Sequence, residues 1–228
     1  MANEEQLSIL RQGVEVWNKW RQEEIHEENY LIEIDLRGAA LWRANLSGAN
    51  LKGVDLSEAT LVECDLSESN LSRASLIGAN LSGASLIGAN LSKADLRGCY
   101  LNGADLRSAT LTGASLICAN IRGADLRRAN LTETDLRETN LSDSNLVQTN
   151  INHANISESN VYGVNIWDLE GEFKEQKNLI ITPEGQSSIT VDNIKIAQFV
   201  YLLLNNEEIR DVINTLTSKS VLILGRFA

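Results

Sequence analysis

The residues that could do chemistry in this chain are few and lie far apart. There are two histidines, His26 and His153, and three cysteines, Cys64, Cys99 and Cys118. A catalytic triad or metal site needs such side chains to converge, and a disulfide framework or zinc site is marked by a characteristic number and spacing of cysteines. Neither pattern occurs, and the glycines recur in steps of five rather than in a phosphate-binding loop. The sequence therefore predicts a protein that is not an enzyme and binds no metal or cofactor.

A five-residue period dominates the chain. Every fifth residue from Leu36 to Ile166 is aliphatic, and the residue two positions before it is small, most often Ala. This spacing fits neither one face of an α-helix nor one face of a flat strand. It fits a chain that extends briefly, bends and repeats, so that both side chains point inward each time. Asp precedes the central Leu only in alternate repeats, which favours four repeats per turn and predicts that residue n stacks on residue n+20.

The units of this repeat, such as Ala-Asn-Leu-Ser-Gly-Ala-Asn-Leu-Lys-Gly at residues 44–53, resemble those of the pentapeptide-repeat family. The resemblance implies an all-β solenoid at residues 31–168, namely a right-handed parallel four-sided β-helix. Functions within this family vary, so the resemblance does not imply one function. We expect about seven coils, a capping helix at residues 1–30, a connector at 169–191, and a helix plus strand at 192–228.

The N-terminal segment has an amphipathic pattern. Leu7, Leu10, Val14 and Trp17 are spaced so that they lie on one face of a single helix. A solenoid ends in unpaired strand edges and an open apolar core, and such a helix would cover both. The capping role is therefore favoured over a partner-binding role.

The C-terminal segment has a different pattern. A short hairpin is predicted around residues 178–190, and a helix is predicted to start at Asp192 or Asn193 and to run to about Thr217. The apolar run from Val221 to Leu224 is typical of a buried strand in a parallel α/β sheet, which needs neighbouring strands.

This C-terminal stretch also resembles a known type of segment. Residues 193–227 are similar to the lead-in to Toll/interleukin-receptor-like domains of some bacterial pentapeptide-repeat proteins. The resemblance and the lone predicted strand imply that the native protein continues beyond Ala228 into a signalling domain.

The outward positions are predicted to carry ion pairs and apolar interruptions. Asp-Leu-Arg occurs five times, and its Asp and Arg point out together, whereas Ser-Leu-Ile replaces it three times. Gly two positions after the central Leu predicts a corner with positive φ, and larger residues there predict corners of another type. Those larger residues are Glu58, Glu63, Glu68 and Arg128. The candidate interaction surface consists of Trp42, Val62, Ile77, Ile87 and Ile117 on the coils and of Val221, Leu222, Ile223 and Leu224 in the C-terminal segment. Cys64 and Cys99 are predicted to fill the core, and Cys118 and His153 to face outward.

Composition limits the possible functions. The net charge is −11 and no basic stripe occurs, which argues against direct binding of nucleic acid. No signal peptide and no apolar run long enough for a membrane helix occur, so we expect a cytoplasmic protein without a membrane segment. The favoured function is a non-enzymatic protein–protein interaction scaffold or sensor arm. Its protein partner is unknown, and it would form a homodimer through the C-terminal segment. The alternatives are a DNA-mimicking binder of DNA gyrase and the arm of an enzyme whose catalytic domain lies beyond residue 228.

Overall fold

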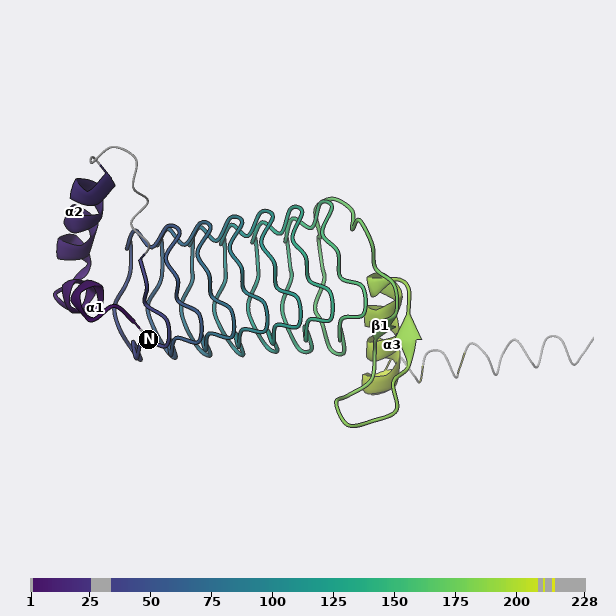
Figure 1. The fold of residues 1–228 in the computed structure, drawn as a ribbon. Helices are drawn as coiled ribbons and strands as arrows, with labels where there is room; N and C mark the ends of the chain where they lie inside the picture. Colours follow the sequence, from purple (N-terminus) through teal and green to yellow (C-terminus); the bar gives the residue numbers. More distant parts are fainter. Residues whose placement is uncertain (1, 26–33, 209–210, 212–214, 216–228) are drawn as a thin grey trace, which may run out of the picture.

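The central part of the protein is an elongated coil with short, regularly stacked turns (Figure 1). The structure, a computed structural model, describes residues 2–25, 34–208, 211 and 215. Parallel bridges join residue n to residue n+20 from the Asp35–Asp55 pair to the Asn160–Ile180 pair. Because the aliphatic period is five, each turn holds four repeats, and the predicted stacking of n on n+20 is confirmed. We number the sides of the coil by their first central leucine. Side 1 starts at Leu36, side 2 at Leu41, side 3 at Leu46 and side 4 at Leu51, and each side continues at every twentieth residue.

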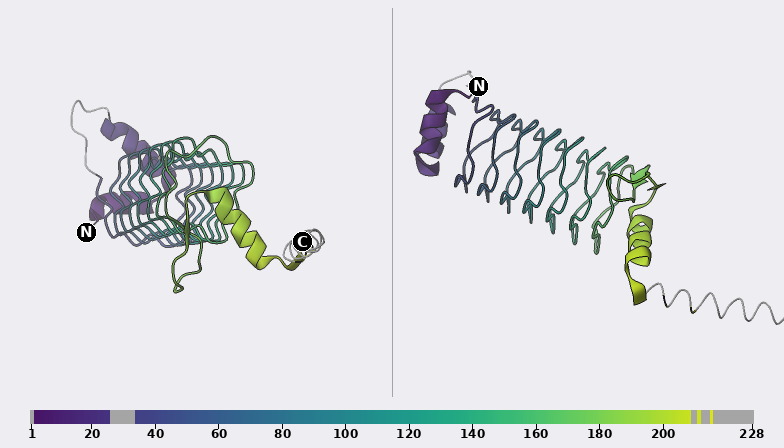
Figure 2. Two further views of the ribbon diagram at one scale, coloured as in Figure 1. Left: turned by 90° about the vertical axis from the view of Figure 1, so that its right-hand side faces the viewer. Right: turned by 90° about the horizontal axis from the view of Figure 1, so that it is seen from below.

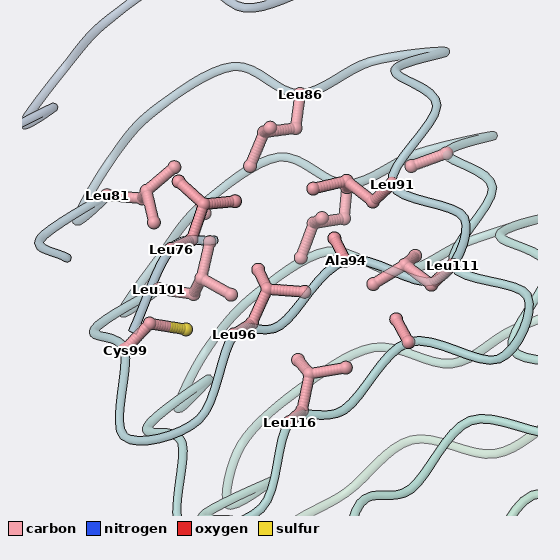
Figure 3. Close-up of a cluster of buried hydrophobic side chains, with 14 of the residues drawn as sticks. Leu76, Leu81, Leu86, Leu91, Ala94, Leu96, Cys99, Leu101, Leu111 and Leu116 are labelled. Carbon is pink, nitrogen blue, oxygen red and sulfur yellow. The ribbon is translucent and has the colours of Figure 1, made fainter. Parts of the chain in front are cut away.

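The interior of the coil is filled by the central aliphatic residues and by the small residues that precede them. Leu76, Leu81, Leu86 and Leu91 form one turn and point into the interior (Figure 3), and none of them is exposed to solvent. At about 1.5–3 kcal/mol for each buried Leu, this stack is the main stabilising contribution to the rod. Thr and Ser replace Ala at several small positions of the later turns, where their hydroxyls donate to main-chain carbonyls. Thr139 Oγ1, for example, donates to Leu116 O at 2.8 Å.

The cysteines lie where the sequence predicted them. Cys64 and Cys99 are buried, and Cys118 is exposed. Burial raises the pKa of Cys99 to about 12, so its thiol stays protonated and acts as an apolar filler. None of the three forms a disulfide bond.

The corners of the coil have a single conformation, which corrects the expectation of two types. Gly38 has φ 68°, and Glu58, Glu63, Glu68 and Arg128 have φ between 55° and 59°, all in the left-handed region. A non-glycine residue in this region costs about 1–2 kcal/mol. The solenoid forms nevertheless, because the ladder and the buried leucines on either side fix the path of the chain.

The N-terminal segment forms two helices rather than the predicted one. Helix α1 spans Glu4–Arg11 and helix α2 spans Val14–Ile25, with Gly13 between them at φ 118°. That φ is incompatible with a continuous helix and is adopted most easily by glycine. Both helices lie at the end of the rod where the first turn begins (Figure 1), and Leu7, Leu10 and Trp17 are buried there.

The solenoid ladder continues beyond the last aliphatic repeat, which corrects the expectation of a connector after Trp167. Glu170, Glu175 and Ile180 are bridged to the previous turn. Main-chain hydrogen bonds do not require a central Leu, so the ladder persists where the aliphatic period has ended. Strand β1 (Leu179–Ile180) then pairs antiparallel with β2 (Thr190–Val191), as the predicted hairpin required.

Helix α3 (Ile194–Asn205) lies at the other end of the rod (Figure 1, Figure 2). Asn193 caps it, since its side chain accepts from the amides of Lys195 and Ile196. The helix ends earlier than predicted, because Asn206 has extended backbone, and residues 207, 208, 211 and 215 are helical again. The predicted strand Val221–Leu224 lies outside the described residues. None of the helices in the described part of the chain has the length and apolar character that a membrane crossing requires.

Candidate interaction surfaces

Two of the predicted surface residues lie together on side 2. Trp42 and Val62 belong to successive turns, since Arg43 N donates to Val62 O at 3.0 Å and Ala40 bridges Thr60. The Trp42 side chain is 57% exposed, and the Arg43 guanidinium lies 4.2 Å from the centre of its ring. Trp42 therefore offers a flat apolar surface beside a cation.

The three predicted isoleucines do not form a single patch. Ile77 and Ile117 lie on side 1, two turns apart with Arg97 between them, whereas Ile87 lies on side 3. Ile77 is exposed, and the other two are half-buried. Each isoleucine is therefore a separate apolar position among polar neighbours.

Sides 1 and 3 carry the ion pairs predicted from the Asp-Leu-Arg units, and these pairs are confirmed. The five Arg Nη2–Asp Oδ2 distances are 2.6–2.7 Å, in the pairs Arg37–Asp35, Arg97–Asp95, Arg107–Asp105, Arg127–Asp125 and Arg137–Asp135. Arg37 and Arg107 also approach the Asp of the next turn, at 3.7 and 3.8 Å. Hydrogen bonds from Arg37 lower the pKa of the Asp35 carboxyl to about 2. Much of the acidic character of sides 1 and 3 is thus compensated locally.

The edge of side 4 is paired with side chains of α2. In each inner turn, a side uses one N–H and two C=O groups to pair with the turn before it. On side 4 of the first turn, Asn50 N donates to Asn18 Oδ1 at 2.7 Å, and Asn50 O accepts from Trp17 Nε1 at 2.9 Å. Lys52 O accepts from Arg21 Nη2 at 2.7 Å. Three side chains therefore replace the main chain of a preceding turn.

The edge of side 1 is also paired, by residues at the start of α1. Asp35 N donates to Gln6 Oε1 at 2.9 Å, and Asp35 O accepts from Asn3 N at 2.6 Å. These contacts satisfy ladder groups that would otherwise be available for pairing with another chain. Sequence reasoning missed all of them, because no pattern marks a polar helix residue that meets a strand edge some thirty residues away.

The C-terminal end carries apolar surface that the sequence did not single out. Ile194 and Ala197 of α3 are buried, and Tyr201 packs edge-on against Tyr162 with ring centres 5.0 Å apart. The opposite side of the helix has no such neighbours. The exposed fractions at this end are 52% for Ile196, 57% for Phe199, 61% for Leu204, 60% for Trp167 and 59% for Ile189. The sequence carries a signal for this surface, because apolar residues surround the whole of α3. When such a helix is covered on one side only, the apolar residues on its other side stay exposed.

The groove around His153 offers no recognisable chemistry. It has a volume of about 670 Å³ and is lined by Glu133, Thr134, Asp135, Arg137, His153, Asn155 and Lys174. Asp135 is already paired with Arg137, and the groove lacks a nucleophile held by a base. Among the described residues, no three His, Cys, Asp or Glu side chains converge as a metal site would require.

The regular ladder of five-residue units is matched by the family model for pentapeptide repeats, which fits residues 30–67, 64–103, 89–128 and 129–168. The chain belongs to the pentapeptide-repeat family. Members of this family are generally non-catalytic structural or interaction proteins, and their solved structures are right-handed β-helices. No match was found among curated proteins.

Several solved pentapeptide-repeat structures are similar to this chain. HetL, involved in heterocyst differentiation regulation in the cyanobacterium Nostoc sp. strain PCC 7120, is 29% identical over 74% of this chain and 97% of its own, with a TM-score of 0.33. A pentapeptide-repeat protein from the thylakoid lumen of Arabidopsis thaliana is 37% identical over 42% of this chain and 71% of its own, with a TM-score of 0.27. QnrB1, a plasmid-mediated fluoroquinolone resistance protein, is 19% identical over 56% of this chain and 77% of its own, with a TM-score of 0.44.

Proposed function

We propose that this pentapeptide-repeat protein is a non-enzymatic protein–protein interaction scaffold that forms a homodimer through α3. The observation that carries the proposal is the exposed apolar side of α3, where Ile196 and Phe199 are each more than half exposed and Leu203 is half-buried. Large apolar side chains gathered at one place on a soluble surface are typical of interaction sites. Trp167 and Ile189 extend the apolar character of this end of the rod.

A second copy of the chain is the partner that this surface suits best. A two-fold dimer buries the same patch twice, so one apolar helix face can pair with itself without a second complementary surface. Ile196, Phe199 and Leu203 have the three- and four-residue spacing at which helices pack side by side. No charged residue separates these three in the sequence, so no charge repulsion would oppose the contact.

The remaining parts have structural roles in this proposal. The segment 1–30 caps the rod, 31–168 is the repeat solenoid, whose ladder continues to Ile180, and residues 181–191 lead into the segment 192–228, in which α3 forms the dimer contact. The same last segment would lead into a signalling domain in a longer cytoplasmic protein. No described residue of this chain supports a role as the arm of an enzyme.

The gyrase-binding alternative has weaker support. A DNA mimic needs rows of uncompensated negative charge along the rod, and the net charge of −11 is in its favour. The five Asp–Arg pairs on sides 1 and 3, however, place a guanidinium beside each of those carboxylates.

Light scattering of the purified chain tests the proposal. We expect the wild-type chain to have twice the monomer mass of 25.1 kDa, and Phe199→Ser to have the monomer mass. Ile77→Ser is the matched control, since Ile77 is exposed on side 1 and should leave the dimer intact. A wild-type chain that stays monomeric at high concentration would contradict dimerisation. A dimer that survives Phe199→Ser would assign the contact to another surface.

A further inference from the structure

The first turn of the solenoid has two further edges, on sides 2 and 3, that α1 and α2 do not fill. By the pattern of the inner turns, the ladder groups on side 2 are Ala40 N–H, Ala40 C=O and Trp42 C=O. On side 3 they are Asn45 N–H, Asn45 C=O and Ser47 C=O. Within the part of the chain that the structure describes, these six main-chain groups have no hydrogen-bond partner. Ala40, Trp42 and Asn45 are exposed, so the groups lie at an accessible rim.

The inner turns show what would fit these six groups. The segment of residues 79–88 pairs with the turn after it through six main-chain hydrogen bonds. Three are Tyr100 N to Ala79 O at 2.9 Å, Leu81 N to Tyr100 O at 2.7 Å and Gly83 N to Asn102 O at 3.0 Å. The other three are Asp105 N to Ala84 O at 2.9 Å, Leu86 N to Asp105 O at 2.7 Å and Gly88 N to Arg107 O at 3.0 Å.

We propose that the open edge formed by residues 40–42 and 45–47 binds an uncharged segment of a different protein by strand addition, with the segment bending where the edge turns the corner at Arg43. The donors and acceptors at this edge are main-chain groups at ladder spacing, which a polypeptide backbone complements and a small ligand does not. Side 2 is uncharged here, with Ala40, Trp42, Thr60 and Val62 on its surface, whereas side 1 begins with the Asp35–Arg37 ion pair. An uncharged segment is therefore favoured over an acidic or basic one.

Trp42 supplies the side-chain anchor of this site. Its ring is 57% exposed and lies in the strand that carries the open groups, so an incoming apolar side chain can pack against it. Exposed Trp and neighbouring Arg are the residue types that most often dominate binding energy at protein interfaces. Arg43 already lies 4.2 Å from the ring, on the corner between the two open sides.

The occupant comes from another protein, because the repeats of this rod are used within its own ladder. The described residues from Leu36 to Val161 donate and accept in the n to n+20 pattern, and Ile180 at the far end is paired with Thr190. Among the described residues, the last turn of a second copy leaves the side-3 groups Val164 O, Ile166 N and Asp168 N open, whereas on side 2 Ile180 already pairs with Ser159 O and Val161 N. A second copy therefore could not complement both open sides without unwinding. The site lies at the end opposite α3, so it does not depend on the proposed dimer.

Fluorescence anisotropy with a labelled peptide tests the site on the full chain. The probe has the sequence of residues 79–88, which is uncharged and offers the six complementary groups. We expect saturable binding to the wild-type chain, and binding weakened by about tenfold or more in Ala40→Pro, which removes one donor at a position where no hydrogen bond of the fold is lost. Trp42→Ala should also weaken binding. Absence of saturable binding to the wild-type chain would overturn the proposal.

A second probe keeps the test decisive if Ala40→Pro fails to fold. The same peptide with N-methyl groups on Leu81 and Leu86 keeps its side chains but loses two of its main-chain donors. We expect it not to bind, and equal affinity of the two peptides would overturn strand addition. If the wild-type chain grows beyond a dimer with concentration and the unmethylated peptide suppresses this growth, the occupant is a second copy. The assignment to a different protein would then be wrong.

Discussion

The two ends of the rod are covered in different ways. At the N-terminal end, Trp17 is fully buried, and its Nε1–H replaces the amide of a preceding turn. Asn18 Oδ1 replaces a main-chain carbonyl by accepting from Asn50 N, and Arg21 Nη2 replaces a second amide by donating to Lys52 O. At the C-terminal end, α3 buries Ile194 and Ala197 but leaves Phe199 57% exposed. The N-terminal helices thus pair main-chain edge groups and shield the apolar core at the same time. In contrast, α3 covers the last turn but adds exposed apolar surface of its own.

This difference shows that an end of a solenoid has two separate requirements. The apolar core must be shielded from water, and the main-chain groups of the edge must find partners. α1 and α2 meet the first requirement and, on sides 1 and 4, the second. At the other end, β1 pairs with β2 of the same chain, and the outer side of α3 remains exposed for a partner. The N-terminal helices should therefore contribute more to stability, and α3 more to association.

The largest expected effect is that of Trp17→Ala. Removal of a fully buried Trp and its hydrogen bond should lower the free energy of unfolding by about 3–5 kcal/mol. Phe199→Ala removes a mostly exposed ring at the other end and should change the free energy of unfolding by less than about 0.5 kcal/mol in the monomer. Urea denaturation at a protein concentration where the chain is monomeric measures both values. Similar losses for the two variants would contradict the assigned difference between the ends.

A smaller effect is expected for Asn18→Ala. The substitution leaves Asn50 N–H without its acceptor and Gly48 O without its donor, which should cost about 1–3 kcal/mol. Lys19→Ala is the control, because Lys19 is exposed and its ion pair with Glu23 is long, at 3.8 Å. Hydrogen exchange of the Asn50 amide should become faster in Asn18→Ala and stay unchanged in Lys19→Ala. An unchanged rate in both variants would mean that Asn18 does not protect the edge.

The middle of the rod could be predicted from the sequence, whereas at its ends the helices and the hairpin could be predicted but their contacts could not. Leu36 and its equivalents recur in one environment, so one inference about inward packing applies to every turn. The main-chain ladder is less visible, because Glu170 and Glu175 continue it without an aliphatic residue in register. The corners were misjudged, since Glu58 adopts the positive φ that glycine favours.

The contacts at the two ends are not repeated and join residues far apart in sequence. Trp17 meets Asn50 only because the break at Gly13 turns α2 across the first turn. No periodic signal encodes such a contact. Trp42 and Val62 could be chosen as candidate surface residues because they are apolar and because the n to n+20 stacking places them side by side. The open main-chain edge beside Trp42 has no sequence signal, because it is defined by ladder hydrogen bonds that the first turn lacks and the inner turns have.

The smallest expected effect concerns the ion pair at the start of the rod. Asp35 has a pKa of about 2, lowered chiefly by hydrogen bonds from Arg37 and below the value of about 3.9 expected in an unfolded chain. A carboxyl whose pKa is lower in the folded state stabilises the fold above the unfolded pKa and loses this contribution as pH falls toward 2. Because Arg37 is exposed, the contribution should stay below about 1 kcal/mol.

A carboxyl titration followed by NMR measures this pKa directly, and Arg37→Gln should raise it toward the unfolded value. Glu175, at the other end of the rod, is the matched comparison, since its pKa is lowered chiefly by the hydrogen bond from Lys177, at 2.7 Å. The exposed lysine should hold its carboxylate less firmly than the two-nitrogen contact of Arg37 holds Asp35. Lys177→Gln should therefore shift the pKa of Glu175 by less than Arg37→Gln shifts that of Asp35. Equal shifts would mean that the two terminal ion pairs are equivalent and that the ends differ only in how their edges and apolar cores are covered.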